Sequence, residues 1–222
     1  MKNVLIVTDT APQDKSGGGT NGNMHCRMIN SNENLNVYTI YITNQSIELT
    51  DHVMKTEDSS RIEKIEAVLH GYPPYLNKKA VTRIIETIQE KDVSIVYIDN
   101  SISGQLVKRI KEKYTDITII AFFHDIEIVK MREDKDVSFL RKMILPIFYR
   151  NERLTVEFAD RTIVLNERDK KQYEKEYQNN SGRAGRCGGG RHPAGRLLRH
   201  PAPGQRRGQD HHGGGGSQRR KL

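Results

Sequence analysis

Short, almost continuous runs of β-branched and aromatic residues alternate with helix-like segments through the first 178 residues. Five such runs are expected to be strands, at residues 3–8, 36–42, 93–98, 117–123 and 161–165. Because the runs lack a polar face, they are typical of strands buried on both sides. Strands that alternate with helices form parallel sheets with right-handed crossovers. The sequence therefore predicts an α/β fold, with a doubly wound, mostly parallel Rossmann-like sheet and helices on both faces.

Amphipathic segments separate these runs. The expected helices cover residues 20–29, 77–91, 105–114, 137–159 and 167–177. Asn77 and Asn166 stand at expected N-cap positions, where a side-chain oxygen accepts a hydrogen bond from a first-turn amide. Residues 61–69 are interpreted as a strand, with a helix as the open alternative.

The composition changes abruptly near Gln178. Residues 179–222 contain no Ile, Val, Phe or Tyr, and the only leucines there are Leu197, Leu198 and Leu222. Such a segment cannot bury enough apolar surface to offset the entropy lost on ordering. We therefore divide the chain into a Rossmann-like domain, 1–178, and a disordered tail rich in Gly, Arg, His and Pro, 179–222. The residues of the tail have GC-rich codons and those of the body AT-rich ones, which indicates an unrelated segment read out of frame.

The net charge of +8 belongs to the tail. From residue 181 onward nine arginines and Lys221 are opposed by Asp210 alone, so this segment carries +9 and the rest of the chain −1. A near-neutral body gives no support for nucleic-acid binding. Cys26 and Cys187 lie on opposite sides of the composition break and are expected to be free thiols, as in a reducing compartment. No signal peptide follows Met1 and no apolar run reaches about 20 residues, so we expect a cytoplasmic protein.

The first expected strand is followed by a long Gly-rich segment. Within it, Gly17-Gly18-Gly19-Thr20-Asn21-Gly22 matches the dinucleotide-binding pattern G-x-G-x-x-G. That pattern requires its first Gly directly after the strand and an acidic residue at the end of the second strand. Here residues 9–16 intervene, and Thr43-Asn44 follow the second strand. We expect a loop whose amides contact an anionic ligand other than NAD, with a flexible surface loop as the alternative.

Polar residues follow the strand at 117–123, in the order His124-Asp125-Ile126-Glu127. Ligands of open parallel sheets bind beyond the carboxyl ends of the strands. Asp99 ends the preceding strand and faces the same crevice or caps the next helix; we favour the cap. With the opening strand, the glycine triplet and residues 158–167, this pattern resembles the N-terminal Rossmann-like domain of family 4 glycosyltransferases of the GT-B fold, over roughly residues 1–177.

The resemblance implies a retaining transfer of a sugar from a nucleotide diphosphate sugar to a sugar or lipid-linked acceptor, in the synthesis of cell-surface polysaccharides or glycoconjugates. It implies no metal and no cofactor besides the donor substrate. His124 would contact the donor sugar as the catalytic residue, although a strand-end histidine that bonds a neighbouring loop is the alternative. The expected substrate-binding residues are Gly17, Gly18, Gly19, Asp125 and Glu127.

Members of this family carry a second domain with a Glu-x7-Glu motif and basic residues that neutralise the diphosphate leaving group. No Glu follows Tyr177 in this sequence, and Asp210 is the only acid there. We therefore expect the chain to be inactive alone. The main alternative is a non-catalytic nucleotide- or partner-binding α/β domain whose basic tail contacts nucleic acid, although that tail has none of the aromatic residues that stack on bases. An oxidoreductase is a weaker alternative.

Residues 139–153 allow two interpretations. Six apolar residues with helical spacing are flanked by Arg141, Lys142, Arg150 and Arg153. A basic amphipathic helix of this kind binds membrane surfaces. Packing of the apolar residues onto the sheet explains the pattern equally well, and we favour it. The membrane interpretation would place the protein at the inner face of the membrane by peripheral contact.

Overall fold

The computed structural model describes residues 1–57, 59–133, 139–178 and 196–199. Six strands form an all-parallel sheet in the order β3-β2-β1-β4-β5-β6, and a short strand β7 extends it beside β6. The strands are β1 (Lys2–Thr8), β2 (Leu35–Ile42), β3 (Val53–Thr56), β4 (Ile95–Ile98), β5 (Thr118–Phe123), β6 (Arg161–Val164) and β7 (Arg196–Arg199). This is the doubly wound order, in which the order of the strands along the chain reverses between β1 and β4. The predicted α/β fold class is confirmed.

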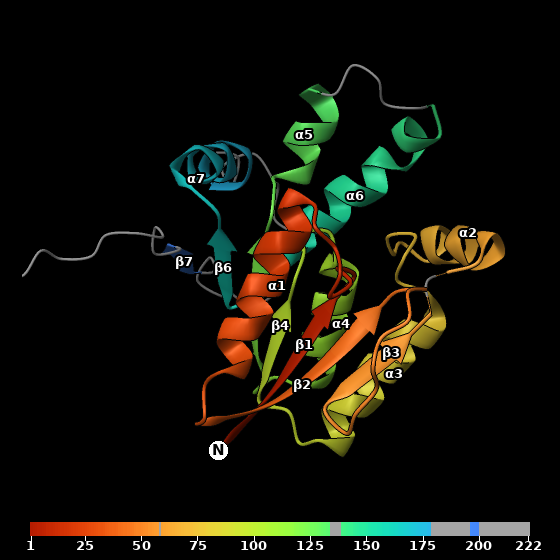
Figure 1. Cartoon of the computed structure of the whole chain (residues 1–222). Coiled ribbons are helices and arrows are strands. Elements are labelled where there is room, and N and C mark those ends of the chain that lie inside the picture. Colours follow the sequence, from red (N-terminus) through yellow and green to blue (C-terminus); the bar gives the residue numbers. More distant parts are fainter. Residues whose placement is uncertain (58, 134–138, 179–195, 200–222) are drawn as a thin grey trace, which may run out of the picture.

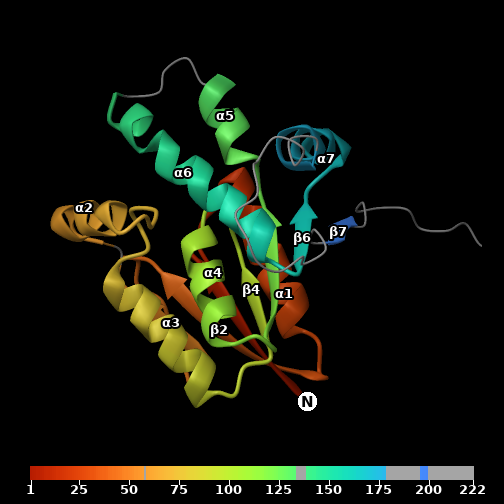
Figure 2. The ribbon, with the colours of Figure 1, turned by 180° about the vertical axis from the view of Figure 1, so that it is seen from behind.

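The helices cover both faces of the sheet. They are α1 (Gly17–Asn30), α2 (Arg61–Leu69), α3 (Lys78–Glu90), α4 (Gly104–Lys113), α5 (Glu127–Glu133), α6 (Phe139–Phe158) and α7 (Glu167–Tyr173), which continues as a π-helical turn, Glu174–Gln178. Figure 1 shows α1 on one face, and the view from behind in Figure 2 shows α3 and α4 on the other. α5 and the first half of α6 extend beyond the carboxyl ends of the strands in both views.

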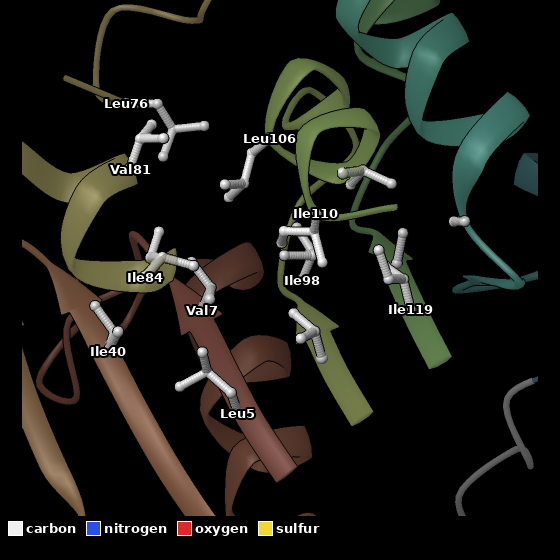
Figure 3. Close-up of a cluster of buried hydrophobic side chains, with 14 of the residues drawn as sticks. Leu5, Val7, Ile40, Leu76, Val81, Ile84, Ile98, Leu106, Ile110 and Ile119 are labelled. Atoms are coloured by element: carbon white, nitrogen blue, oxygen red, sulfur yellow. The ribbon is translucent and has the colours of Figure 1, made fainter. Parts of the chain in front are cut away.

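The sheet is buried on both sides, as its apolar strands predict. Leu5 and Val7 of β1 pack with residues of α3 and α4 in a large cluster (Figure 3). Val4 and Ile6 point to the opposite face and pack with Cys26 of α1 in a smaller cluster. Because successive side chains of a strand point to opposite faces, one short apolar run supplies both halves of the core.

The glycine triplet is helical, contrary to the predicted loop. α1 begins at Gly17, three residues before the expected start, because Ser16 is its N-cap and the Ser16 hydroxyl accepts a hydrogen bond from the Gly19 amide at 3.0 Å. A capped first turn offsets the low helix propensity of glycine.

The strand interpretation of residues 61–69 is wrong, because this segment forms α2. Its N-terminus carries a capping box, in which the Ser60 hydroxyl accepts from the Glu63 amide and the Glu63 carboxylate accepts from the Ser60 amide. Ile62, Ile65 and Leu69 remain 63–80 % exposed, so the helix does not depend on core packing. β3, a half-buried edge strand, and α5 were not expected from the sequence.

Other expected elements are confirmed with small shifts at their ends. Asn77 and Asn166 are the N-caps of α3 and α7, and each side-chain oxygen accepts the expected amide hydrogen bond. α6 continues through Pro146, and its first two expected residues, 137 and 138, lie outside the described residues. Leu145 and Tyr149 of α6 pack against the larger core cluster, while Met143 is 62 % exposed. Leu145 and Tyr149 are not among the six apolar residues of the two interpretations, so their packing does not decide between core packing and a membrane face for that set.

Four residues of the predicted tail, Arg196–Arg199, pair with β6 as the parallel strand β7. The other residues of that tail, 179–195 and 200–222, lie outside the described residues, and so do Cys187 and Asp210. Cys26 is a free, buried thiol. Within the part of the chain that the structure describes, no helix is both long and apolar enough to cross a membrane.

Candidate functional site

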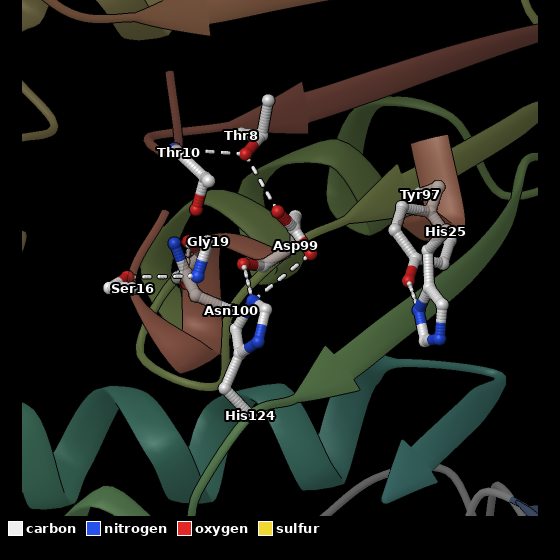
Figure 4. Close-up of polar contacts among 10 residues, drawn as sticks. Thr8, Thr10, Ser16, Gly19, His25, Tyr97, Asp99, Asn100 and His124 are labelled. Atoms are coloured by element: carbon white, nitrogen blue, oxygen red, sulfur yellow. Dashed lines mark hydrogen bonds and ion pairs between the residues drawn. The ribbon is translucent and has the colours of Figure 1, made fainter. Parts of the chain in front are cut away.

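Three neighbouring strands deliver polar side chains to one edge of the sheet. β1 ends at Thr8, β4 is followed by Asp99, and β5 is followed by His124. These strands are adjacent in the order β1-β4-β5, so the three residues meet at the carboxyl end of the sheet (Figure 4). The reversal of strand order between β1 and β4 lies at the same point, which is where open α/β sheets bind ligands.

Asp99 is the centre of this group. Its side chain is fully buried; Oδ2 accepts a hydrogen bond from Thr8 Oγ1 at 2.7 Å, and Oδ1 lies 3.1 Å from His124 Nε2. The favoured interpretation of Asp99 as a helix cap is wrong, because Ser103 is at the N-cap of α4 and Asp99 faces the crevice. Because β1, β4 and β5 end side by side, Asp99 lies within hydrogen-bonding distance of Thr8 and His124, and it serves as their common partner.

The Asp99–His124 pair is mostly shielded from water, since the His124 side chain is 17 % exposed. Burial lowers the pKa of His124, but the hydrogen bond and the charge of Asp99 outweigh it, and the pKa is raised above its ordinary value. Asp9 follows β1 at the solvent-exposed rim of the site. Desolvation by the surrounding protein, followed by the charge of Asp99, raises the pKa of the Asp9 carboxyl, although part of the residue is exposed.

Helix α1 lies directly against the pair at Gly22. A Cβ atom at this position would lie 2.7 Å from Asp99 Oδ2 and 3.3 Å from His124 Cε1. Gly22 is the last glycine of the G-x-G-x-x-G match, and in dinucleotide-binding folds the third glycine permits close packing of helix and strand. The motif was therefore the sequence signal for this contact, although Gly22 was not among the expected site residues.

The predicted glycines Gly17–Gly19 form the first turn of α1, one turn before Gly22. The structure brings Gly22 into contact with His124, and the atoms nearest to a Cβ on Gly19 belong to Asp14. Asp14 occupies the N-terminal end of the helix: its carboxylate accepts a hydrogen bond from the Ser16 amide at 2.8 Å and would overlap a Cβ atom on Gly19. An anionic ligand at these amides would therefore lie beside a carboxylate.

Asp125 and Glu127 lie on the α5 side of the edge. Both carboxylates contact Lys130, at 2.8 Å from Asp125 Oδ2 and 3.5 Å from Glu127 Oε1. Asp125 also borders an open cleft of about 380 Å³ between α5 and α7, which Arg168 and Gln172 line from the other side. The structure therefore pairs Asp125 with a lysine and a separate cleft, and no described contact joins it to α1.

Sequence reasoning missed a chain of hydrogen bonds behind the crevice. The Tyr75 hydroxyl lies 2.8 Å from Ser103 Oγ, which donates to Asn100 Oδ1 at 2.6 Å. Tyr75 follows a Pro-Pro turn 24 positions before Asp99, so no local pattern linked it to the site. His25 of α1 lies further along the sheet, with Nδ1 2.8 Å from the Tyr97 hydroxyl, and it packs the helix onto Phe122.

The described residues contain no group of three or more His, Cys, Asp or Glu side chains arranged to hold a metal ion. The end of β2 is Ile42, followed by Thr43 and Asn44, so the ribose-binding carboxylate of NAD-binding folds is absent from that position. The chemistry available at this edge is that of a buried carboxylate–imidazole pair, hydroxyl groups, and a helix N-terminus.

A comparison with models of known protein families finds no match, and a comparison with curated proteins finds none either. The functional argument therefore rests on the site itself: a shielded Asp99–His124 pair at the reversal point of the sheet, in contact with α1.

Proposed function

We propose that this chain is the N-terminal, acceptor-side half of a retaining glycosyltransferase that binds a nucleotide diphosphate sugar. The observation that carries the proposal is the Asp99–His124 pair beneath Gly22, at the point where the strand order reverses. Ligands bind at this point in open parallel sheets. The imidazole of His124 directly follows β5, the strand after which the resemblance expects the histidine that contacts the donor sugar. The doubly wound order supports the same proposal.

In the proposed reaction the bond between the anomeric carbon and the diphosphate oxygen breaks, a bond to the acceptor oxygen forms, and the proton of the acceptor hydroxyl passes to the leaving diphosphate. Negative charge develops on the diphosphate, and stabilisation of that charge accelerates the reaction. In this chain His124 would contact the sugar. Phosphates bound at the start of α1 would have to displace the Asp14 carboxylate, which accepts from the Ser16 amide and lies against Gly19. Basic residues of a second domain would supply most of the charge stabilisation, so we expect no turnover by this chain alone.

The acceptor in this proposal is a sugar or a lipid-linked sugar, and the site of action is the cytoplasm. The cleft between α5 and α7, with Asp125 at its border, is the proposed acceptor side. Binding at the inner face of the membrane would follow from a lipid-linked acceptor, and the exposed Met143 and Lys142 of α6 favour such a contact.

Calorimetric titration of the full chain with UDP-glucose and GDP-mannose tests the proposal. We expect weak binding of one of the two, reduced at least about tenfold by His124→Ala. His70→Ala is the matched control, because His70 is exposed at the end of α2, and it should leave the affinity unchanged. The proposal fails if neither nucleotide sugar binds at millimolar concentration, or if His124→Ala binds as the wild type does.

One observation favours a second function, a non-catalytic binding domain. His124 Nε2 already bonds Asp99, and within the described residues His124 Nδ1 is buried without a hydrogen-bond partner. A histidine whose Nε2 is held by Asp99 can join the ends of β4 and β5 without touching a ligand, as this alternative requires; the unpartnered Nδ1 is not explained by it. Binding of RNA that falls with rising salt and is lost when residues 180–222 are deleted would support this alternative.

A further inference from the structure

We propose that Glu152 is a positioning residue of this site. Its hydrogen bonds hold the loops that carry Asp99 and His124 on the α6 side, opposite the crevice. This inference deepens the proposed function, because it names a residue through which the candidate site keeps its geometry. Glu152 lies on α6, 28 positions beyond His124, and was not among the expected site residues.

Glu152 joins four separate segments of the chain. Its carboxylate accepts hydrogen bonds from the Glu127 amide at 2.9 Å, the Ile128 amide at 3.1 Å and the Tyr177 hydroxyl at 2.6 Å. The Ser101 side chain also hydrogen-bonds it. The side chain is fully buried, so these contacts replace water completely. A buried carboxylate with four partners from three other segments is expensive to desolvate and is expected only where the arrangement must be kept.

The partners of Glu152 are close in sequence to the candidate site. Ser101 is two residues after Asp99, and Glu127 is three residues after His124. The sheet itself aligns β4 and β5 only as far as Ile98 and Ala121, and the residues beyond these strands need other contacts. The Asp99–His124 pair joins the two loops on the crevice side, and Glu152 joins them on the α6 side through Ser101 and the Glu127 amide.

Asn151, next to Glu152 on α6, attaches this part of the helix to α4 and to the turn after α2. Asn151 Oδ1 accepts from the Gln105 amide at 2.8 Å, and its Nδ2 donates to the Gly71 carbonyl at 2.8 Å. A Cβ atom on Gly104 would overlap the Asn151 carbonyl, so α4 and α6 are in backbone contact there. The backbone of α6 at Glu152 is therefore held against α4.

The chemistry of the group requires a carboxylate. The two amides around Glu152 only donate hydrogen bonds, and the Tyr177 and Ser101 hydroxyls donate to it as well. Glutamine offers one acceptor oxygen and would turn its NH2 group toward donors, so at least one of the four would lose its acceptor. Tyr177 belongs to the π-helical turn after α7, and its removal deletes one bond while the other three stay.

The test measures His124 directly, by NMR titration of its ring proton signals in the full chain. We expect Glu152→Gln and Tyr177→Phe to move the titration midpoint of His124 toward its ordinary value, since the contact with Asp99 loosens. Both should weaken nucleotide-sugar binding, Glu152→Gln by about tenfold. Glu157→Gln, an exposed position on the same helix, is the matched control and should leave both quantities unchanged.

An unchanged His124 titration in both folded variants would overturn the inference. If Glu152→Gln does not fold, Tyr177→Phe decides alone, because it keeps the carboxylate and the phenyl ring. If the titration moves while the wild type binds no nucleotide sugar, the positioning role stands and the proposed function falls.

Discussion

Gly22 shows how a single missing side chain permits the site to form. The α1 backbone approaches Asp99 and His124 so closely that a β-carbon would stand 2.7 Å from a buried carboxylate oxygen. Alanine is a better helix former than glycine by about 1 kcal/mol, so helix propensity and packing oppose each other at this position. Packing should dominate, because the atom in the way belongs to a buried pair and not to a flexible surface side chain.

Gly22→Ala is therefore expected to destabilise the protein by about 1–3 kcal/mol, as overpacked substitutions do. Urea unfolding measures the change. Thr20→Ala, at an exposed position of the same helix, should stay within about 0.5 kcal/mol of the wild type. A Gly22→Ala variant more stable than the wild type would show that α1 does not press on the pair.

The protonation of His124 gives a second residue-scale prediction. Asp99, and more distantly Asp9, raise the pKa of His124 above 6.5, so protonation favours the folded state. This stabilisation is complete below about pH 6.5 and is lost as the pH rises through the raised pKa. The difference in unfolding free energy between wild type and His124→Gln should therefore be larger at pH 6 than at pH 9.

Urea unfolding at the two pH values measures this difference, and the exposed His70→Gln provides the control. A difference that grows with pH would contradict the charge pairing with Asp99.

At the scale of single elements, the same cap chemistry serves helices with very different roles. Asn77 caps α3, whose Ile84 and Ile88 are buried against the sheet. Ser60 caps α2, whose apolar side chains are largely exposed. The loss of a cap weakens a helix, but global stability falls only where that helix carries part of the core.

Asn77→Ala should therefore lower the free energy of unfolding by about 1–2 kcal/mol. Ser60→Ala should leave the global transition nearly unchanged and speed hydrogen exchange at the amides of α2. Urea unfolding and amide exchange separate the two outcomes. Equal losses of global stability would mean that α2 packs as firmly as α3.

At the scale of the whole molecule, one sheet connects two apolar clusters. Ile6 of β1 is buried in the cluster between the sheet and α1. Ile84 of α3 is buried in the cluster on the opposite face, between the sheet and α3 and α4. Because both clusters pack on the same strands, the body is expected to unfold in a single cooperative transition. Ile6→Ala and Ile84→Ala should each cost about 2–5 kcal/mol, although they lie on opposite faces.

Far-UV circular dichroism and tyrosine fluorescence should report coincident unfolding curves for both variants. Ile62→Ala on the exposed side of α2 is the control and should leave the midpoint in place. Two separated transitions would contradict the single core.

Local patterns in the chain determined the strands of the sheet's centre, the helices α3, α4 and α7, and the caps Asn77 and Asn166, because periodicity and cap chemistry act over a few residues. Two segments were predicted wrongly, although their caps are equally local signals. A Ser16 cap made the glycine triplet helical, and a capping box made residues 61–69 a helix.

The candidate site was only half visible in the sequence. His124 could be selected from its place after an apolar strand, and the G-x-G-x-x-G match marked the glycine that touches it. Asp99 contacts Thr8 and His124, and Glu152 bonds the loops that follow β4 and β5. These contacts join residues that are 24 to 91 positions apart in the sequence. Only the order of parallel strands brings such residues within hydrogen-bonding distance, so the tertiary structure alone decided them.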